Sequence, residues 1–236
     1  MSVKSTRLIL NREFRNFFSS PAAYIVITLY LLVTGWFFFS TFFLVGRADL
    51  RGFFSLLPVI LSLTIPAVTM RLFSEEYRSG SYEILGTLPV TTLDIVLGKA
   101  LSALLFSAFM LLPTLSYPLF LSFLGDLDWG PVIGGYLGAL LLSAAYIGLG
   151  VLFSSTTRNQ IVAFILSASV CLFLSLVDRM LVLIPPGLGR ILQSIGSGYH
   201  FTNISRGIID SRDLLYFLSV IFLSLYGAWI VNREYR

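Results

Sequence analysis

The chain has 236 residues, of which 56% are hydrophobic and only 12% are charged, and its formal net charge is +4. A soluble domain is about 25% charged, and the apolar residues here come in long runs instead of at helix or strand spacing. This composition excludes an ordinary soluble domain and places the chain in a membrane. The single Cys171 excludes an internal disulfide, and no basic cluster is dense enough to predict nucleic acid as a partner.

The N-terminal stretch "RLILNREFRNFFSSP" predicts an amphipathic helix, because its apolar and basic residues fall on different faces. The apolar face carries Leu10, Phe14, Phe17 and Phe18, and the other face carries Arg12, Arg15 and Ser19. We expect this helix to lie on the membrane surface with its basic residues near anionic headgroups. The alternative is a frayed extension of the first span, but Ser20 and Pro21 mark a break before the membrane.

Six intervals without charge reach the length of about 20 residues that a spanning helix needs. The predicted spans are 22–46, 52–71, 98–124, 131–154, 160–178 and 213–232. The prediction is an all-α integral membrane protein, a single transmembrane domain over residues 1–236, with both termini on the same side of the bilayer.

Lys and Arg residues give the orientation, since they are enriched on the cytoplasmic side. With the termini cytoplasmic, ten basic residues lie inside and six lie outside. We therefore expect both termini in the cytoplasm.

Charge occurs only at the ends of the predicted spans, and their charge-free interiors hold nothing that would mark an ion or proton path, which disfavours an ion-coupled pump. The fourth span instead has small residues at near-helical spacing, Gly134, Gly138, Ala145 and Gly148. Small residues allow helices to approach closely. A cavity lined by such uncharged spans would suit a lipid-like or amphipathic substrate.

The long segment 178–213, before the last span, predicts short re-entrant or interfacial helices on the outer face, with Pro185 and Pro186 between them. His200 lies here and has no cysteine or carboxylate cluster close to it in the sequence, so a satisfied interfacial side chain is the simpler interpretation. Asp126 and Asp128 on another outer loop are interpreted as solvated turn residues.

The stretch "RLFSEEYRSGSYEILGTLPVTTLDIVLGKA" holds seven of the 28 charged residues between the second and third spans. It contains no phosphate-binding loop, because Ala100 follows Gly98 and Lys99 where Ser or Thr is required. A short helix over 82–87, between Gly80 and Pro89, is suited to docking on a soluble partner. The alternative is a solvated loop whose charges only fix the topology.

This stretch resembles the segment between the second and third spans of permease subunits of the type-2 export class of ABC transporters. The resemblance is carried by Glu75, Glu76, Gly80, Ser81, Glu83, Leu85, Pro89, Gly98 and Lys99, with Ser81 at a position where Thr is commoner in that class. The start "NREFRNFFSSPAAYIVITLYLLVTGWFF" and the end "HFTNISRGIIDSRDLLYFLS" are similar to the gliding-motility-associated branch of the class.

The resemblance implies a non-catalytic membrane subunit in a bacterial or archaeal cytoplasmic membrane. It implies a dimer with a second permease, identical or homologous, and a separate ABC ATPase subunit that binds ATP and Mg²⁺. It also implies a cytoplasmic coupling helix after the second span. We assign ATPase coupling to Glu75, Glu76, Arg78, Gly80, Ser81, Tyr82, Glu83, Leu85, Pro89 and Lys99.

The function predicted from these observations is ATP-driven export. Two alternatives stay open. The first is a complex that uses ATP to drive mechanotransmission or assembly at the cell envelope. The second is an intramembrane enzyme that uses His200 with the outer aspartates.

Overall fold

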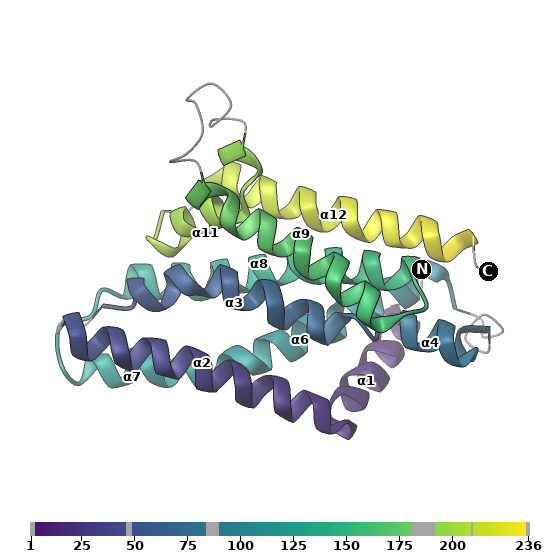
Figure 1. Cartoon of the computed structure of the whole chain (residues 1–236), viewed down its shortest axis with the longest axis horizontal. Helices are drawn as coiled ribbons and strands as arrows, with labels where there is room; N and C mark the ends of the chain where they lie inside the picture. Colours follow the sequence, from purple (N-terminus) through teal and green to yellow (C-terminus); the bar gives the residue numbers. More distant parts are fainter. Residues whose placement is uncertain (1–2, 46–48, 84–89, 181–191, 209, 235–236) are drawn as a thin grey trace.

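The computed structural model describes residues 3–45, 49–83, 90–180, 192–208 and 210–234, and every regular element in these ranges is a helix (Figure 1). In chain order they are α1 (Val3–Ser19), α2 (Pro21–Val45), α3 (Arg51–Thr69), α4 (Ser74–Ser79), α6 (Thr92–Leu111), the 3₁₀ helix η1 (Leu112–Leu115), α7 (Ser116–Ser122), α8 (Trp129–Thr156), α9 (Gln160–Met180), α11 (Ser197–Ser205) and α12 (Ser211–Glu234).

Six stretches of the described chain are long and apolar enough to cross a bilayer. The third of them runs through α6, η1 and α7, over Thr92–Ser122. The prediction of an all-helical chain with six membrane-spanning helices is therefore confirmed. Both termini lie at the same end of the bundle as α4, which we call the α4 end, and α11 lies toward the opposite end, which we call the α11 end (Figure 1).

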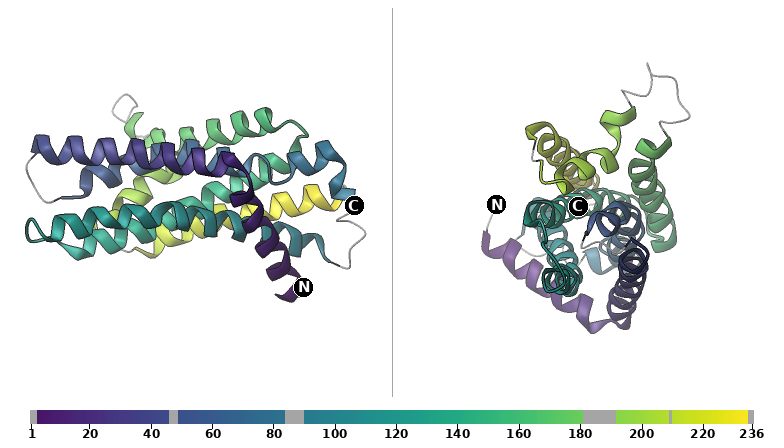
Figure 2. Two further views of the ribbon diagram at one scale, coloured as in Figure 1. Left: turned by 90° about the horizontal axis from the view of Figure 1, so that it is seen from below. Right: turned by 90° about the vertical axis from the view of Figure 1, so that its left-hand side faces the viewer.

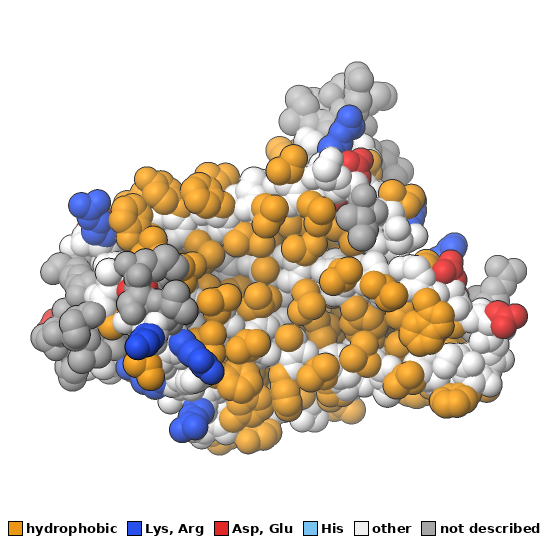
Figure 3. All heavy atoms as spheres, turned by 180° about the vertical axis from the view of Figure 1, so that it is seen from behind, with side chains coloured by type: hydrophobic (Ala, Val, Ile, Leu, Met, Phe, Trp, Pro, Cys, Tyr) orange, Lys and Arg blue, Asp and Glu red, His pale blue; other side chains and the backbone are white. Residues whose placement is uncertain are grey.

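The outside of the bundle is covered by large apolar side chains. Phe43 is 78% exposed, Trp36 is 73% exposed and Phe222 is 68% exposed. Figure 3 shows such side chains over the middle of one face, with charged side chains toward its ends. An apolar surface of this extent is stable only when hydrocarbon covers it.

The third spanning stretch begins earlier than the sequence indicated. Thr91 caps α6 by accepting a hydrogen bond from the Asp94 backbone N–H at 3.2 Å, and the Asp94 carboxylate accepts one from the Thr91 backbone N–H at 3.1 Å. This capping box fixes a helix start at Thr92, whereas the predicted span began at 98. Lys99 therefore lies well inside α6 and not in the first turn of the spanning helix.

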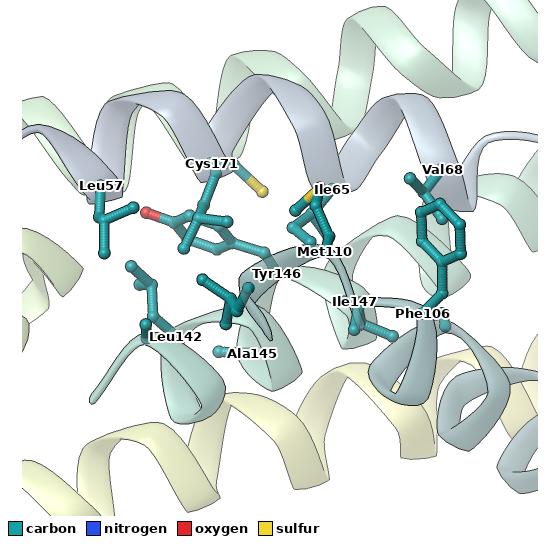
Figure 4. Packing of buried hydrophobic residues seen from close by; sticks show 14 of the residues in the cluster. Leu57, Ile65, Val68, Phe106, Met110, Leu142, Ala145, Tyr146, Ile147 and Cys171 are labelled. Carbon is teal, nitrogen blue, oxygen red and sulfur yellow. The ribbon is translucent and has the colours of Figure 1, made fainter. Parts of the chain in front are cut away.

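Helix α8 lies at the centre of the bundle and packs against α3, α6, α9, α11 and α12. Its glycines allow this, as the small-residue pattern predicted: a Cβ on Gly134 would lie 2.3 Å from the Ile204 carbonyl oxygen of α11, and one on Gly148 would lie 2.1 Å from the Ser224 hydroxyl oxygen of α12. Figure 4 shows Tyr146 of α8 packed among buried apolar residues such as Leu57 and Cys171.

Helix α1 is set at a steep angle to the spanning helices and packs against α6 (Figure 2). The Phe17 ring stacks on Phe106 with centroids 5.0 Å apart, and the Phe18 ring meets Phe109 edge-on at 5.1 Å. Part of the apolar face predicted for α1 thus packs on α6. Its placement on a membrane surface stays a prediction.

At the α11 end, the short helix α11 is buried on one side and packs against α3, α8, α9 and α12. Phe201 and Ile204 fill that contact. Pro185 and Pro186 lie outside the described residues, and the re-entrant nature of this segment stays a prediction.

Candidate functional site

The charged segment after the second span contains a short helix that the sequence did not predict. After α3, residues 70–73 turn and lead into α4, which ends at Ser79 and is followed by its C-cap residue Gly80. Gly80 has φ +72°, a left-handed conformation that glycine adopts without strain. The helix predicted over 82–87 falls mostly outside the described residues, as do the predicted coupling residues Leu85 and Pro89.

The start of α4 is fastened to the end of α8 by one hydroxyl group. Ser154 Oγ accepts hydrogen bonds from the backbone N–H groups of Phe73 at 3.0 Å and Ser74 at 3.2 Å, and it donates to the Met70 carbonyl at 3.0 Å. The first N–H groups of a helix have no partner within the helix. Ser154, which is fully buried, therefore supplies an acceptor that α4 lacks.

A buried lysine joins α4 to α6. Lys99 is 1% exposed, and its Nζ donates to the Leu72 carbonyl at 2.6 Å and lies 2.8 Å from Glu76 Oε1. The ammonium also lies 5.1 Å from the centre of the Phe73 ring. A buried ammonium is stable only when paired and hydrogen-bonded, and these contacts meet that need.

Helix α1 completes this network. Glu13 Oε1 lies 3.5 Å from Lys99 Nζ, and Arg12 Nη2 lies 2.6 Å from Glu13 Oε1 and 3.3 Å from Glu76 Oε1. Burial alone would raise the pKa of the Glu13 carboxyl, but Lys99 and Arg12 together hold that pKa below its ordinary value of 4.5. We call Arg12, Glu13, Glu76 and Lys99 the four-charge network.

Further contacts hold α1 close to α6. Thr6 Oγ1 donates to Asp94 Oδ1 at 3.1 Å. A Cβ on Gly98 would lie 2.8 Å from Ile9 Cγ2, so the two helices cross where α6 has no side chain. The four-charge network therefore lies beside a tight helix crossing.

The C-terminal end of α12 binds residues 77–82, in and just after α4, from another side. Tyr77 Oη donates to Asn232 Oδ1 at 2.6 Å, and Tyr82 Oη donates to the Asn232 carbonyl at 3.2 Å. The two tyrosine rings meet edge-on with centroids 4.8 Å apart. Asn232 is fully buried, so residues 74–83 are bonded to α1, α6, α8 and α12.

The predicted coupling residues fall into two groups. Tyr82 and Lys99 are buried and Glu76 is mostly so, and these bind other helices of the chain. The exposed group is Glu75, Arg78, Gly80 and Glu83, and Ser81 is half-buried. We call Glu75, Arg78 and Glu83 the exposed rim. An open cleft of about 720 Å³ lies beside it between α1 and α4, and Arg71, Glu75 and Ser81 are among its lining residues.

His200 and Asp128, two of the residues considered for an enzyme, each bond to other groups of the chain. His200 Nδ1 lies 2.6 Å from Asp213 Oδ1, its Nε2 lies 3.1 Å from the Ser194 carbonyl oxygen, and its ring stacks on Tyr216. Asp128 instead accepts a hydrogen bond from the Gly130 N–H at the start of α8. Among the described residues no group of three His, Cys, Asp or Glu could hold a metal ion.

Comparison with known families decides the class. The family model described as ABC-2 family transporter protein matches residues 39–194, about two thirds of the chain. The chain belongs to this family. It is the permease subunit of an ABC transporter, a multi-pass membrane component of a kind that is generally non-catalytic. No curated protein sequence matches the chain.

The family match places α4 and Lys99 inside the shared part of this ABC-2 permease. Arg12 and Glu13 of α1, and Asn232 of α12, lie outside the matched range. The four-charge network thus joins the shared core to a helix that precedes it.

Proposed function

We propose that this permease is driven by a separate ATPase subunit, which binds ATP and Mg²⁺ and docks at the α4 end. The observation that carries the proposal is the attachment of residues 74–83 to four helices: buried side chains bond this segment to α6, α8 and α12, and the partly exposed Arg12 bonds it to α1. Close-packed contacts transmit a displacement with little compression. A push on this one segment would therefore move four helices together.

The exposed rim supplies the surface that such a partner would contact. Glu75, Arg78 and Glu83 are exposed. Exposed charges at an interface steer association and select the partner. Residues that bond internally, such as Lys99, would instead pass the movement on.

The proposal also covers the membrane, the orientation and the second permease. It places the protein in the cytoplasmic membrane of a bacterium or archaeon with both termini inside, supported by the ten basic residues on that side against six on the other. It includes a second permease, identical or homologous, in a dimer. Export as the direction of transport, and membership of the gliding-motility-associated branch, rest on the sequence resemblance.

The test is the charge reversal Glu83→Lys in the reconstituted complex of permease and ATPase. We expect ATP hydrolysis to lose its stimulation by substrate while the variant inserts in the membrane at the parent level. The matched control is Asp126→Lys, an equal reversal on an exposed acid at the α11 end. Substrate-stimulated ATPase activity at the parent level in Glu83→Lys would remove Glu83 from the coupling surface.

The same preparation separates export from envelope mechanotransmission. ATP-dependent movement of a solute or lipid across vesicles made from the purified complex supports export. ATP hydrolysis without any such movement, in complexes that remain assembled, supports mechanotransmission or assembly instead.

A further inference from the structure

An apolar groove of about 600 Å³ lies between the first turns of α6 and the middle turns of α12, on the outside of the bundle. All nine lining residues are large and apolar or aromatic, three from α6 and six from α12. It is distinct from the cleft beside α4, which is lined largely by polar and charged residues. The proposed function leaves the groove without a role.

The groove is about as long as the acyl layer of one leaflet is thick. It follows α12 from Leu218 to Trp229, and eleven residues of α-helix rise about 17 Å. The hydrocarbon core of a bilayer is about 30 Å thick, so this length matches one acyl layer. Trp229 and Tyr226 lie at the end near the C-terminus, where aromatic residues mark the membrane interface.

A cation lies just beyond that end. The Arg233 guanidinium lies over the Trp229 ring, 5.6 Å from its centre, and Arg233 is exposed. None of the carboxylates in the described part of the chain forms an ion pair with it. A guanidinium binds a phosphate through charge-assisted hydrogen bonds. The groove therefore combines an apolar channel with a phosphate-binding group at the headgroup level.

The lining argues against a second copy of the chain as occupant. Close helix pairs in membranes use Gly, Ala, Ser and Thr at their contact, and the groove presents none of these. An acyl chain is flexible and adapts to a surface of Leu, Ile, Val and Phe side chains.

We propose that this groove is a binding site for one anionic phospholipid, with an acyl chain along α12 and its phosphate on Arg233. The site does not depend on the ATPase partner. It would select lipid from the leaflet at the α4 end, and Arg233 would give it a preference for anionic over zwitterionic headgroups.

The test uses the fluorescence of Trp229 in the full chain. Trp36 and Trp129 are the other two tryptophans, and the variant Trp36→Phe/Trp129→Phe leaves Trp229 as the only emitter. This variant is reconstituted in phosphatidylcholine vesicles that contain either brominated phosphatidylglycerol or brominated phosphatidylcholine. Bromine on the acyl chain quenches a tryptophan in contact with it.

We expect phosphatidylglycerol to occupy the site about fivefold more strongly than phosphatidylcholine, the factor that one basic residue near the surface gives. Arg233→Gln should abolish that preference. Leu225→Phe fills the groove and should weaken occupancy, whereas Leu223→Phe makes the same change on α12 at a 66% exposed residue outside the groove and should not. Native mass spectrometry of the parent chain, which needs no tryptophan replacement, should retain one phosphatidylglycerol.

Two results would overturn the proposal. Quenching that follows only the mole fraction of brominated lipid, equally for both headgroups, would mean ordinary boundary lipid. An intermolecular disulfide from Leu225→Cys, in a Cys171→Ala background, would mean that a second copy occupies the groove.

Discussion

Replacing Lys99 with methionine should destabilise the α4 end more than any other single charge removal in the chain. Methionine keeps the length of the side chain and removes its positive charge. The change takes away the partner of the Leu72 carbonyl and leaves Glu76 and Glu13 with Arg12 alone.

The size of the expected stability loss follows from the burial of the charges that Lys99 leaves behind. Removing one member of a buried ion pair costs about 3 to 5 kcal/mol, because the other charge stays buried without compensation. The Glu13 and Glu76 side chains are 10% and 15% exposed, and Arg12 remains beside both. We therefore expect a loss near the lower limit, about 3 kcal/mol, which lowers Tm by about 6 to 12 °C for a chain of this size.

The assay is thermal unfolding of the purified chain in detergent, compared with a variant that neutralises the three mostly buried charges of the network and keeps the partly exposed Arg12. Lys99→Met/Glu13→Gln/Glu76→Gln should recover most of the lost stability, since replacing a complete buried ion network by neutral residues is often close to neutral. The reasoning would be refuted if Lys99→Met lay within about 0.5 kcal/mol of the parent, or if the triple variant were no more stable than the single one.

Three other predictions concern the same bundle. Ser154→Ala leaves two amides at the start of α4 without their acceptor and should cost about 1 to 3 kcal/mol in thermal unfolding; no change in Tm would mean that these amides find another acceptor. Gly134→Ala places a Cβ 2.3 Å from a backbone carbonyl of α11 and should cost about 1 to 3 kcal/mol, whereas Gly35→Ala meets nothing closer than 3.4 Å and serves as the control. Because the pKa of Glu13 is held below 4.5, its contribution is present above pH 4.5 and is lost as pH falls through the lowered value. The difference in Tm between the parent and Glu13→Gln should stay constant from pH 8 to 5 and narrow only in stronger acid, and narrowing already near pH 6 would contradict the ion pairing.

The six membrane-spanning helices could be predicted because a helix that crosses the bilayer core must be apolar along its whole length. Apolar length alone identifies such helices. The close contacts of α8 could also be predicted from its glycines, since close helix contacts in membranes need small residues. Gly134 and Gly148 lie at such contacts.

The four-charge network could not be predicted from the same pattern. Lys99 and Glu76 were counted as charges of a loop, because periodicity says nothing about pairing between residues distant in the chain. One signal was present: Glu13 is the only acid in α1. It lies seven residues from Thr6 and four from Phe17, on the face that packs on α6, where an unpaired carboxylate would be costly.

The pairing of His200 with Asp213 could not be predicted for a related reason. Its partner Asp213 is thirteen residues away, across the connection from α11 to α12. Only the folding of α11 back onto α12 brings the two side chains together, and no local pattern in the sequence records that fold.

The most direct measurement of the central claim is site-specific cross-linking between this permease and its ATPase. A photoreactive amino acid replaces Glu83 in one preparation and Asp126 in another, and each is illuminated in membranes that contain the proposed partner ATPase. We expect a cross-linked product from position 83 and none from position 126. A product from position 126 alone would place the ATPase at the α11 end and contradict the account.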